Sequence, residues 1–196
     1  MPRLPLREVI PQRDLTIPVK SSYRDYIDQL RIDFNSRCGY CDSFDKRRTN
    51  DFEIDHFVPK KVFEELKPND YHNLVYACKS CNRSKSGKWP SNNEKINVVD
   101  NTGFIDPCKN DYDLNFSRDD NGEIDWVTDH GKWMYKELSL FNPEHSILWK
   151  LEKLMRTIQI GIQLSEEKPD NIKIIKGLNA LFLIQESYLN LLFDAK

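Results

Sequence analysis

The stretch EIDHFVPK, residues 53–60, begins as a β-strand and then breaks its own pattern. Phe52 and Ile54 alternate with polar residues, as the apolar positions of a half-buried strand do. Asp55 and His56 then follow side by side, a carboxylate and an imidazole where apolar or neutral residues would pack better. A strand whose polar residues face water would explain this pair, and so would a metal ligand next to a general base. The flanking sequence has to distinguish the two interpretations.

Two Cys-x-x-Cys pairs flank this stretch, Cys38 with Cys41 and Cys78 with Cys81, and 36 residues separate them. Four thiolates presented by two tight turns are what tetrahedral zinc requires. The alternatives are a redox pair, a rubredoxin-like iron site or free buried thiols; a thioredoxin-like pair would open a helix in a βαβ context, which is missing here. We therefore predict a structural zinc site with all four positions filled, and so without catalytic capacity. Cys108 is expected to be a small buried residue.

The whole chain has the composition of a globular protein. Its 196 residues are 39% hydrophobic and 31% charged, enough for one domain with a core, or for a small domain with helical additions. The sequence lacks the roughly 18-residue apolar run of a membrane span, and its first residues lack the apolar region of a signal peptide. We expect a cytoplasmic protein, in which cysteines are metal ligands or free thiols rather than disulfides.

Charge is distributed unevenly along the chain. The net charge is −2, but residues 37–88 hold 11 Lys and Arg against 8 Asp and Glu, a net charge of +3, whereas residues 89–196 hold 12 against 18, a net charge of −6. Charge alone therefore supports nucleic-acid binding only weakly. The basic residues around the cysteines are Lys46, Arg47, Arg48, Lys60, Lys61, Lys79, Arg83, Lys85 and Lys88.

The hydrophobic pattern predicts helices at both ends of the chain. Residues 1–20 form an extended arm, and residues 21–37 a helix capped by Ser22. Apolar stripes at helical spacing predict long helices at 143–164 and 169–195. Core packing is the simpler explanation of these stripes, and a membrane or partner-helix role is the alternative.

The middle of the chain is predicted to be mixed. Strands are expected at 51–58 and at LVYA, residues 74–77; short helices are expected from Pro59 to Leu66 and after Cys78. The polar segment 91–141 is expected to be irregular, with short strands at EIDWVT and KWMY. The predicted organisation is an arm and helix at 1–37, a central module at 38–90, and a segment 91–196 whose helices pack on that module.

Residues 38–88 as a set resemble the HNH endonucleases, which have the ββα-metal fold. CGYC, EIDHFVPK and HNLVYACKSCNRSK match that family in order, spacing and flanking residues. The family's positions correspond here to Asp55-His56, to Asn73 before an apolar pair, and to Asn82, which stands where the namesake motif has a third His. The resemblance implies an α+β fold: a ββα-metal core with a structural zinc on four cysteines, an N-terminal helix and a C-terminal helical hairpin.

The resemblance also implies roles that suit the chemistry of phosphodiester hydrolysis. His56 would be the general base, because an imidazole titrates near neutral pH. Asp55 and Asn82 offer oxygen ligands to a hard divalent ion, Mg²⁺ or Mn²⁺. Asn73 would fix the loop that orients His56. Arg83 and Lys85 would contact phosphate. Since neighbouring side chains of a regular strand point to opposite faces, Asp55 and His56 predict irregular backbone at 55–58.

A looser resemblance extends beyond the module, through FIDPC, DDNGEIDW and LSLFNPE. In that longer form the chain is similar to the PtuB-type HNH proteins of Septu anti-phage systems, which work beside an ATPase. It implies a DNA-cutting defence nuclease with a PtuA-like ATPase partner, held by the helices and the acidic 89–196 region. The alternatives are a non-catalytic zinc-ribbon binding module and a stand-alone restriction or toxin-type nuclease.

Overall fold

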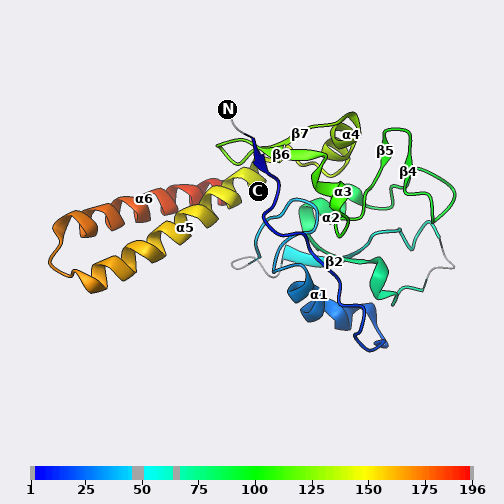
Figure 1. Ribbon diagram of the computed structural model, residues 1–196, viewed down its shortest axis with the longest axis horizontal. Helices are drawn as coiled ribbons and strands as arrows, with labels where there is room; N and C mark the ends of the chain where they lie inside the picture. Colours follow the sequence, from blue (N-terminus) through cyan, green and yellow to red (C-terminus); the bar gives the residue numbers. More distant parts are fainter. Residues whose placement is uncertain (1–2, 46–50, 64–66, 195–196) are drawn as a thin grey trace. The chain divides into compact units, whose positions relative to one another are not determined.

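The computed structural model describes residues 3–45, 51–63 and 67–194 (Figure 1). The chain divides into two compact units, Met1–Phe141 and Asn142–Lys196. The first unit contains the arm, the cysteine-flanked module and the segment that follows it. The packing of the C-terminal helices on the module stays a prediction.

The centre of the first unit is an antiparallel strand pair followed directly by a helix. Strand β2 (Phe52–His56) pairs with β3 (Leu74–Cys78), and α2 (Lys79–Lys85) begins at the end of β3. Four consecutive residues of β3, from Leu74 to Ala77, are buried, so this strand is covered on both faces. The thiol of Cys78 accepts a hydrogen bond from the Cys81 amide and caps α2. The α+β class and the ββα core are confirmed.

Strand β2 stays regular through the pair that was expected to disturb it. Asp55 lies opposite Val75 and His56 opposite Leu74 in an unbroken register. The expectation of irregular backbone is therefore wrong at 55 and 56, and holds at 57–58, where the chain bends away. Beyond Pro59 the backbone makes a single turn over 60–62 instead of the predicted helix. The remainder of that prediction, residues 64–66, lies outside the described part of the chain.

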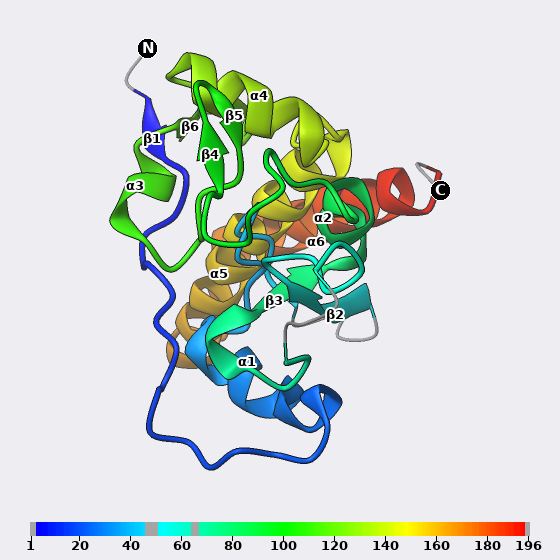
Figure 2. The ribbon, with the colours of Figure 1, turned by 90° about the vertical axis from the view of Figure 1, so that its right-hand side faces the viewer.

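The predicted N-terminal helix is present. Ser22 caps the short 3-10 helix η1 (Tyr23–Tyr26), which continues into α1 (Ile27–Asp33). The residues expected on its apolar face, among them Tyr26 and Leu30, are buried in the core. Helix α1 packs against β3 within the first unit, and Figure 2 shows it lying beside the strand pair. The helix thus covers one side of the module that carries the cysteines.

Residues 91–141 are more ordered than the sequence predicts. A three-stranded sheet joins β1 (Leu4–Pro5), β6 (Phe116–Arg118) and β7 (Ile124–Trp126) in the order β1-β6-β7. The expected strand at EIDWVT is present as β7, but the expected strand at KWMY is wrong. Those residues lie in α4 (Asp129–Glu137), because the Thr128 hydroxyl caps a helix there. Shorter elements complete the segment: β4 (Val98–Val99), β5 (Thr102–Gly103), α3 (Asn110–Asp113) and, before β3, the 3-10 turn η3 (Tyr71–Asn73).

The second unit is a pair of long helices, α5 (Pro143–Glu167) and α6 (Ile172–Asp194), which run side by side (Figure 1). Asn142 caps α5, and Pro143 occupies its first turn. Gly161 allows close packing, because a Cβ there would come within 2.8 Å of Leu178 Cδ2. The predicted hairpin is confirmed. Across the described residues, none of the helices is both long and apolar enough to cross a membrane.

Candidate functional site

Four cysteines form a cluster at the junction of two turns. The sulfur atoms of Cys38, Cys41, Cys78 and Cys81 all lie within 4.8 Å of one another, and the sulfurs of Cys41 and Cys78 are 3.8 Å apart. A tetrahedron with zinc–sulfur bonds of about 2.3 Å has edges of about 3.8 Å. The arrangement therefore fits a tetrahedral metal ion, as the two Cys-x-x-Cys pairs predict. Cys108 lies outside the cluster and is half-buried; burial raises the pKa of its thiol to about 12.

Thiol chemistry at the cluster also favours a bound cation. Hydrogen bonding to the neighbouring thiols and burial raise the pKa of Cys78 and Cys81 well above the usual value. These two thiols hold their protons until a divalent cation balances the negative charge. The site is thus suited to a metal and unsuited to a reactive thiolate.

The first cysteine turn is held by side chains from outside the module. The Gly39 carbonyl accepts a hydrogen bond from Arg7 and the Tyr40 carbonyl accepts one from the Tyr112 hydroxyl. The Cys41 carbonyl accepts a bond of 2.6 Å from Arg118, whose side chain is buried. Gly39 does not adopt a left-handed conformation; it is required because a Cβ would meet Phe34 at 2.7 Å.

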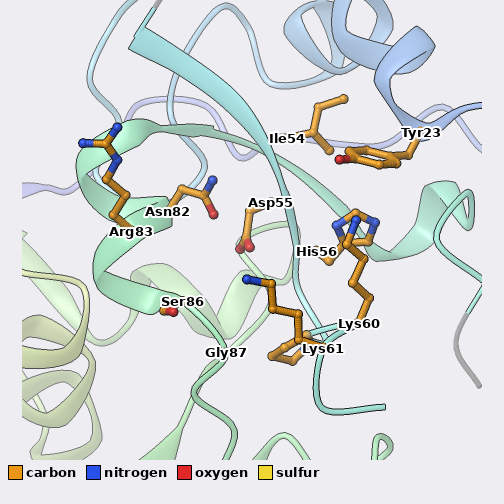
Figure 3. A pocket seen from close by; sticks show the side chains of 11 residues that line it. Tyr23, Ile54, Asp55, His56, Lys60, Lys61, Asn82, Arg83, Ser86 and Gly87 are labelled. Atoms are coloured by element: carbon orange, nitrogen blue, oxygen red, sulfur yellow. The ribbon is translucent and has the colours of Figure 1, made fainter. Parts of the chain in front are cut away.

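A pocket of about 270 Å³ lies beside β2 and α2 (Figure 3). It brings together Asp55, His56 and Asn82, three of the four residues predicted to be catalytic. Arg83 also lines it, as predicted. The other lining residues are Tyr23, Ile54, Pro59, Lys60, Lys61, Ser86 and Gly87.

The pocket explains how two adjacent residues of a regular strand, both predicted to be catalytic, can line one site. Figure 3 shows Asp55 and Asn82 on one side of the β2 ribbon and His56 on the other. Strand β2 pairs only with β3 among the described strands, so its second edge carries no strand. Side chains from both faces can therefore line one pocket that wraps around this edge, and no bulge is needed.

His56 is held in one tautomer by the loop that precedes η3. Its Nε2 lies 2.9 Å from the carbonyl oxygen of Pro68. Because a carbonyl only accepts hydrogen bonds, Nε2 carries the proton and Nδ1 has the free lone pair. The Tyr23 ring packs edge-on against the His56 imidazole, with the two ring centroids 4.8 Å apart. Burial, with smaller contributions from Lys60 and Lys85, lowers the pKa of His56, so the neutral base predominates at neutral pH.

Asp55 is anchored through one of its two oxygens. Its Oδ2 accepts a hydrogen bond from the Tyr40 hydroxyl at 2.5 Å and forms an ion pair with Lys85 Nζ at 2.9 Å. Lys85 is fully buried and also donates to the His56 carbonyl. The prediction that Lys85 contacts phosphate is therefore wrong: its ammonium group neutralises Asp55 inside the protein. Lys85 lies two positions after the exposed Arg83 in the same short helix, so the sequence did not indicate that the Lys85 side chain is buried.

Asn73 lies outside the pocket and clamps the backbone where β2 ends. Its Oδ1 accepts from the Val58 amide at 2.7 Å and its Nδ2 donates to the Val58 carbonyl at 3.0 Å. The Asn73 carbonyl accepts from the Phe57 amide. These bonds define how the chain leaves the strand immediately after His56. That they orient His56 stays a prediction.

The pocket has a basic rim that the sequence only partly predicts. Arg83 and Lys61 are exposed, and Lys60 Nζ lies 4.3 Å from the centre of the Tyr23 ring. Lys60 and Lys61 belong to the basic set around the cysteines, but only the bend at 57–58 brings them beside the pocket. The sequence did not indicate that Tyr23 would line this pocket. Lys46, Arg47 and Arg48, part of the same basic set, lie outside the described residues.

Comparisons with known proteins agree with this geometry. Residues 38–88 match the family model of the HNH endonucleases. The chain is 28% identical over 144 residues to the Septu protein PtuB of Bacillus mycoides (strain KBAB4), covering 61% of this chain and 48% of that protein. It is 36% identical over 62 residues to the Septu protein PtuB of Bacillus thuringiensis, covering 32% of this chain and 23% of that protein.

The chain thus spans about half or less of the length of these curated relatives. No solved structure matches it. The strand pair and helix, the four-cysteine cluster and the family match all fall on the same segment. Residues 38–88 are therefore an HNH endonuclease domain.

Proposed function

We propose that this protein is a divalent-metal-dependent endonuclease that hydrolyses DNA phosphodiester bonds, with His56 as general base. The observation that supports the proposal is one pocket in which the neutral imidazole of His56 lies with Asp55 and Asn82 under a basic rim. A non-catalytic zinc module would not need these three residues in one pocket.

Each side chain has a defined task in this proposal. His56 Nδ1 takes the proton of the attacking water, and the Pro68 carbonyl bonded to Nε2–H stabilises the resulting imidazolium. Asp55 and Asn82 would hold Mg²⁺ or Mn²⁺ through their oxygens. When bound, this ion stabilises negative charge on the phosphate and on the leaving oxygen. Arg83, Lys60 and Lys61 bind the phosphates of the substrate. Asn73 keeps His56 oriented, and zinc on the four cysteines ties the two turns together.

The biological setting is also a proposal. Both curated relatives are Septu proteins named PtuB, which supports a nuclease effector in anti-phage defence with a PtuA-like ATPase partner. The two-helix unit α5–α6 is the part of the chain that we assign to this partner. Co-expression with such an ATPase and co-purification of the pair tests the assignment.

The decisive experiment compares three proteins on plasmid DNA with Mg²⁺ or Mn²⁺: wild type, His56→Ala and His72→Ala. His72 is exposed, lies outside the pocket and serves as the matched control. We expect a loss of at least about 100-fold in rate for His56→Ala, the lower range of a general-base contribution, and none for His72→Ala. Equal cleavage by His56→Ala and wild type would show that the assignment is wrong. Metal analysis should give about one zinc per chain in all three proteins.

A further inference from the structure

Strand β2 and helix α2 face each other through two pairs of polar side chains. Glu53 and Asp55 are two residues apart and share one face of the strand. Asn82 and Lys85 are three residues apart and share one side of the helix. Lys85 Nζ lies 2.9 Å from Asp55 Oδ2, and Asn82 Nδ2 lies 2.8 Å from Glu53 Oε2. The second pair involves a residue, Glu53, to which the sequence motif gives no role.

The bond to Glu53 determines which way the Asn82 amide faces. An ionised carboxylate has acceptors only, so the group turned toward Glu53 has to be the amide NH₂ and cannot be the amide oxygen. The opposite end of the amide, Oδ1, then points toward Asp55, as Figure 3 shows. Two oxygen atoms facing one another cannot bond directly, since neither supplies a hydrogen, and a divalent cation between them is a group that binds both.

We infer that Glu53 is a positioning residue: it holds the Asn82 amide with its oxygen toward the catalytic cation and its nitrogen away from it. If the amide turned over, Nδ2 would point at Asp55 and the cation would lose one of its two protein ligands. The inference rests on the proposed function, in which Asp55 and Asn82 bind that cation. Glu53 itself acts through Asn82 and does not bind the ion.

Glu53→Gln tests this directly, because glutamine has the same shape but can donate as well as accept. In the zinc-loaded 196-residue chain we expect Mn²⁺ affinity, measured by titration calorimetry or by electron paramagnetic resonance, to fall about 10- to 100-fold, as when an outer partner of a metal ligand is removed. The Mn²⁺ concentration for half-maximal cleavage should rise by the same factor, while the rate at saturating Mn²⁺ changes less than about threefold. Glu137→Gln, on α4 and outside the pocket, is the matched control and should change neither.

A second background separates positioning from direct coordination. Asn82→Asp provides two equivalent oxygens, so the side chain presents an oxygen to the cation whichever way it is turned. Adding Glu53→Gln to Asn82→Asp should therefore cost less than about twofold in Mn²⁺ affinity. The inference is overturned if the full loss persists in this background, since Glu53 would then be a ligand itself. It is equally overturned if Glu53→Gln leaves Mn²⁺ affinity unchanged in the wild-type background.

These outcomes can be told apart from failure of the proposed function. Mn²⁺ binding is measured without DNA, so a response to Glu53→Gln supports the inference even if the chain cuts no DNA. Conversely, cleavage that needs His56 and Asp55 but is indifferent to Glu53 keeps the proposed function and removes the inference.

Discussion

At the level of single residues, the chemistry of this site depends on groups that restrict one another. His56 has one free nitrogen because the Pro68 carbonyl occupies the other. Asp55 offers one oxygen to the pocket side because Tyr40 and Lys85 both bind Oδ2. Such arrangements fix protonation and orientation before a substrate arrives, and this preorganisation is what makes polar groups effective in catalysis.

Lys85 should stabilise the fold through Asp55. Its side chain is fully buried, so Lys85→Met would leave a buried carboxylate without its counter-charge, and we expect the free energy of unfolding to fall by about 3 kcal/mol. Urea unfolding of the zinc-loaded protein measures this change. The double variant Lys85→Met/Asp55→Asn removes both charges and should recover more than half of the loss. A double variant as unstable as the sum of the two single variants would contradict this account.

At the level of secondary-structure elements, the first cysteine turn is possible only because a glycine lets it approach the core. A Cβ on Gly39 would lie 2.7 Å from Phe34 and 2.9 Å from Val75, two buried side chains. We expect Gly39→Ala to lower the free energy of unfolding by about 1–3 kcal/mol, the usual cost of overpacking. Thermal or urea unfolding measures it.

The matched control is Gly87→Ala in the same unit. There the nearest atom to a new Cβ is 3.7 Å away, an ordinary contact. We expect its free energy of unfolding to stay within about 0.5 kcal/mol of wild type. Equal stability of the two alanine variants would show that the turn has room to move, contrary to the packing described here.

At the level of the whole molecule, the HNH segment depends on the rest of the first unit. Arg7, Tyr112 and Arg118 donate hydrogen bonds to three consecutive carbonyls of the first cysteine turn. Arg13 donates to the Leu74 carbonyl of β3 at 2.6 Å. Residues before 38 and after 90 therefore satisfy backbone groups that the module cannot satisfy itself.

A truncation experiment follows from this dependence. We expect a fragment of residues 1–141 to bind about one zinc and to unfold cooperatively, since it contains all four of these donors. A fragment of residues 38–90 lacks them and should bind zinc at least about tenfold more weakly, without a cooperative unfolding transition. Zinc competition titration and circular dichroism distinguish the two. Equal zinc affinity of both fragments would mean that the module folds on its own.

Residues whose signal is local could be identified from the amino-acid sequence alone. The cysteine cluster was predictable because residue type and spacing fix the chemistry available to four cysteines. The roles of Asp55, His56, Asn73 and Asn82 follow from the resemblance to the HNH endonucleases and stay predictions. The long helices were predictable because an apolar stripe at helical period has to be buried. The helix at KWMY was predictable too, since Thr128 is a good N-cap, but the strand expected there ignored that local signal.

Features that depend on distant segments meeting could be seen only in the folded protein. Folding buried Lys85 against Asp55, brought Tyr23, Lys60 and Lys61 to the pocket, and placed Glu53 on the Asn82 amide. It also left one edge of β2 without a neighbouring strand among the residues that the structure describes, so that adjacent residues of a regular strand reach one site. Burial and partner choice arise from contacts between residues remote in sequence, and a pattern read along the chain carries no record of those contacts.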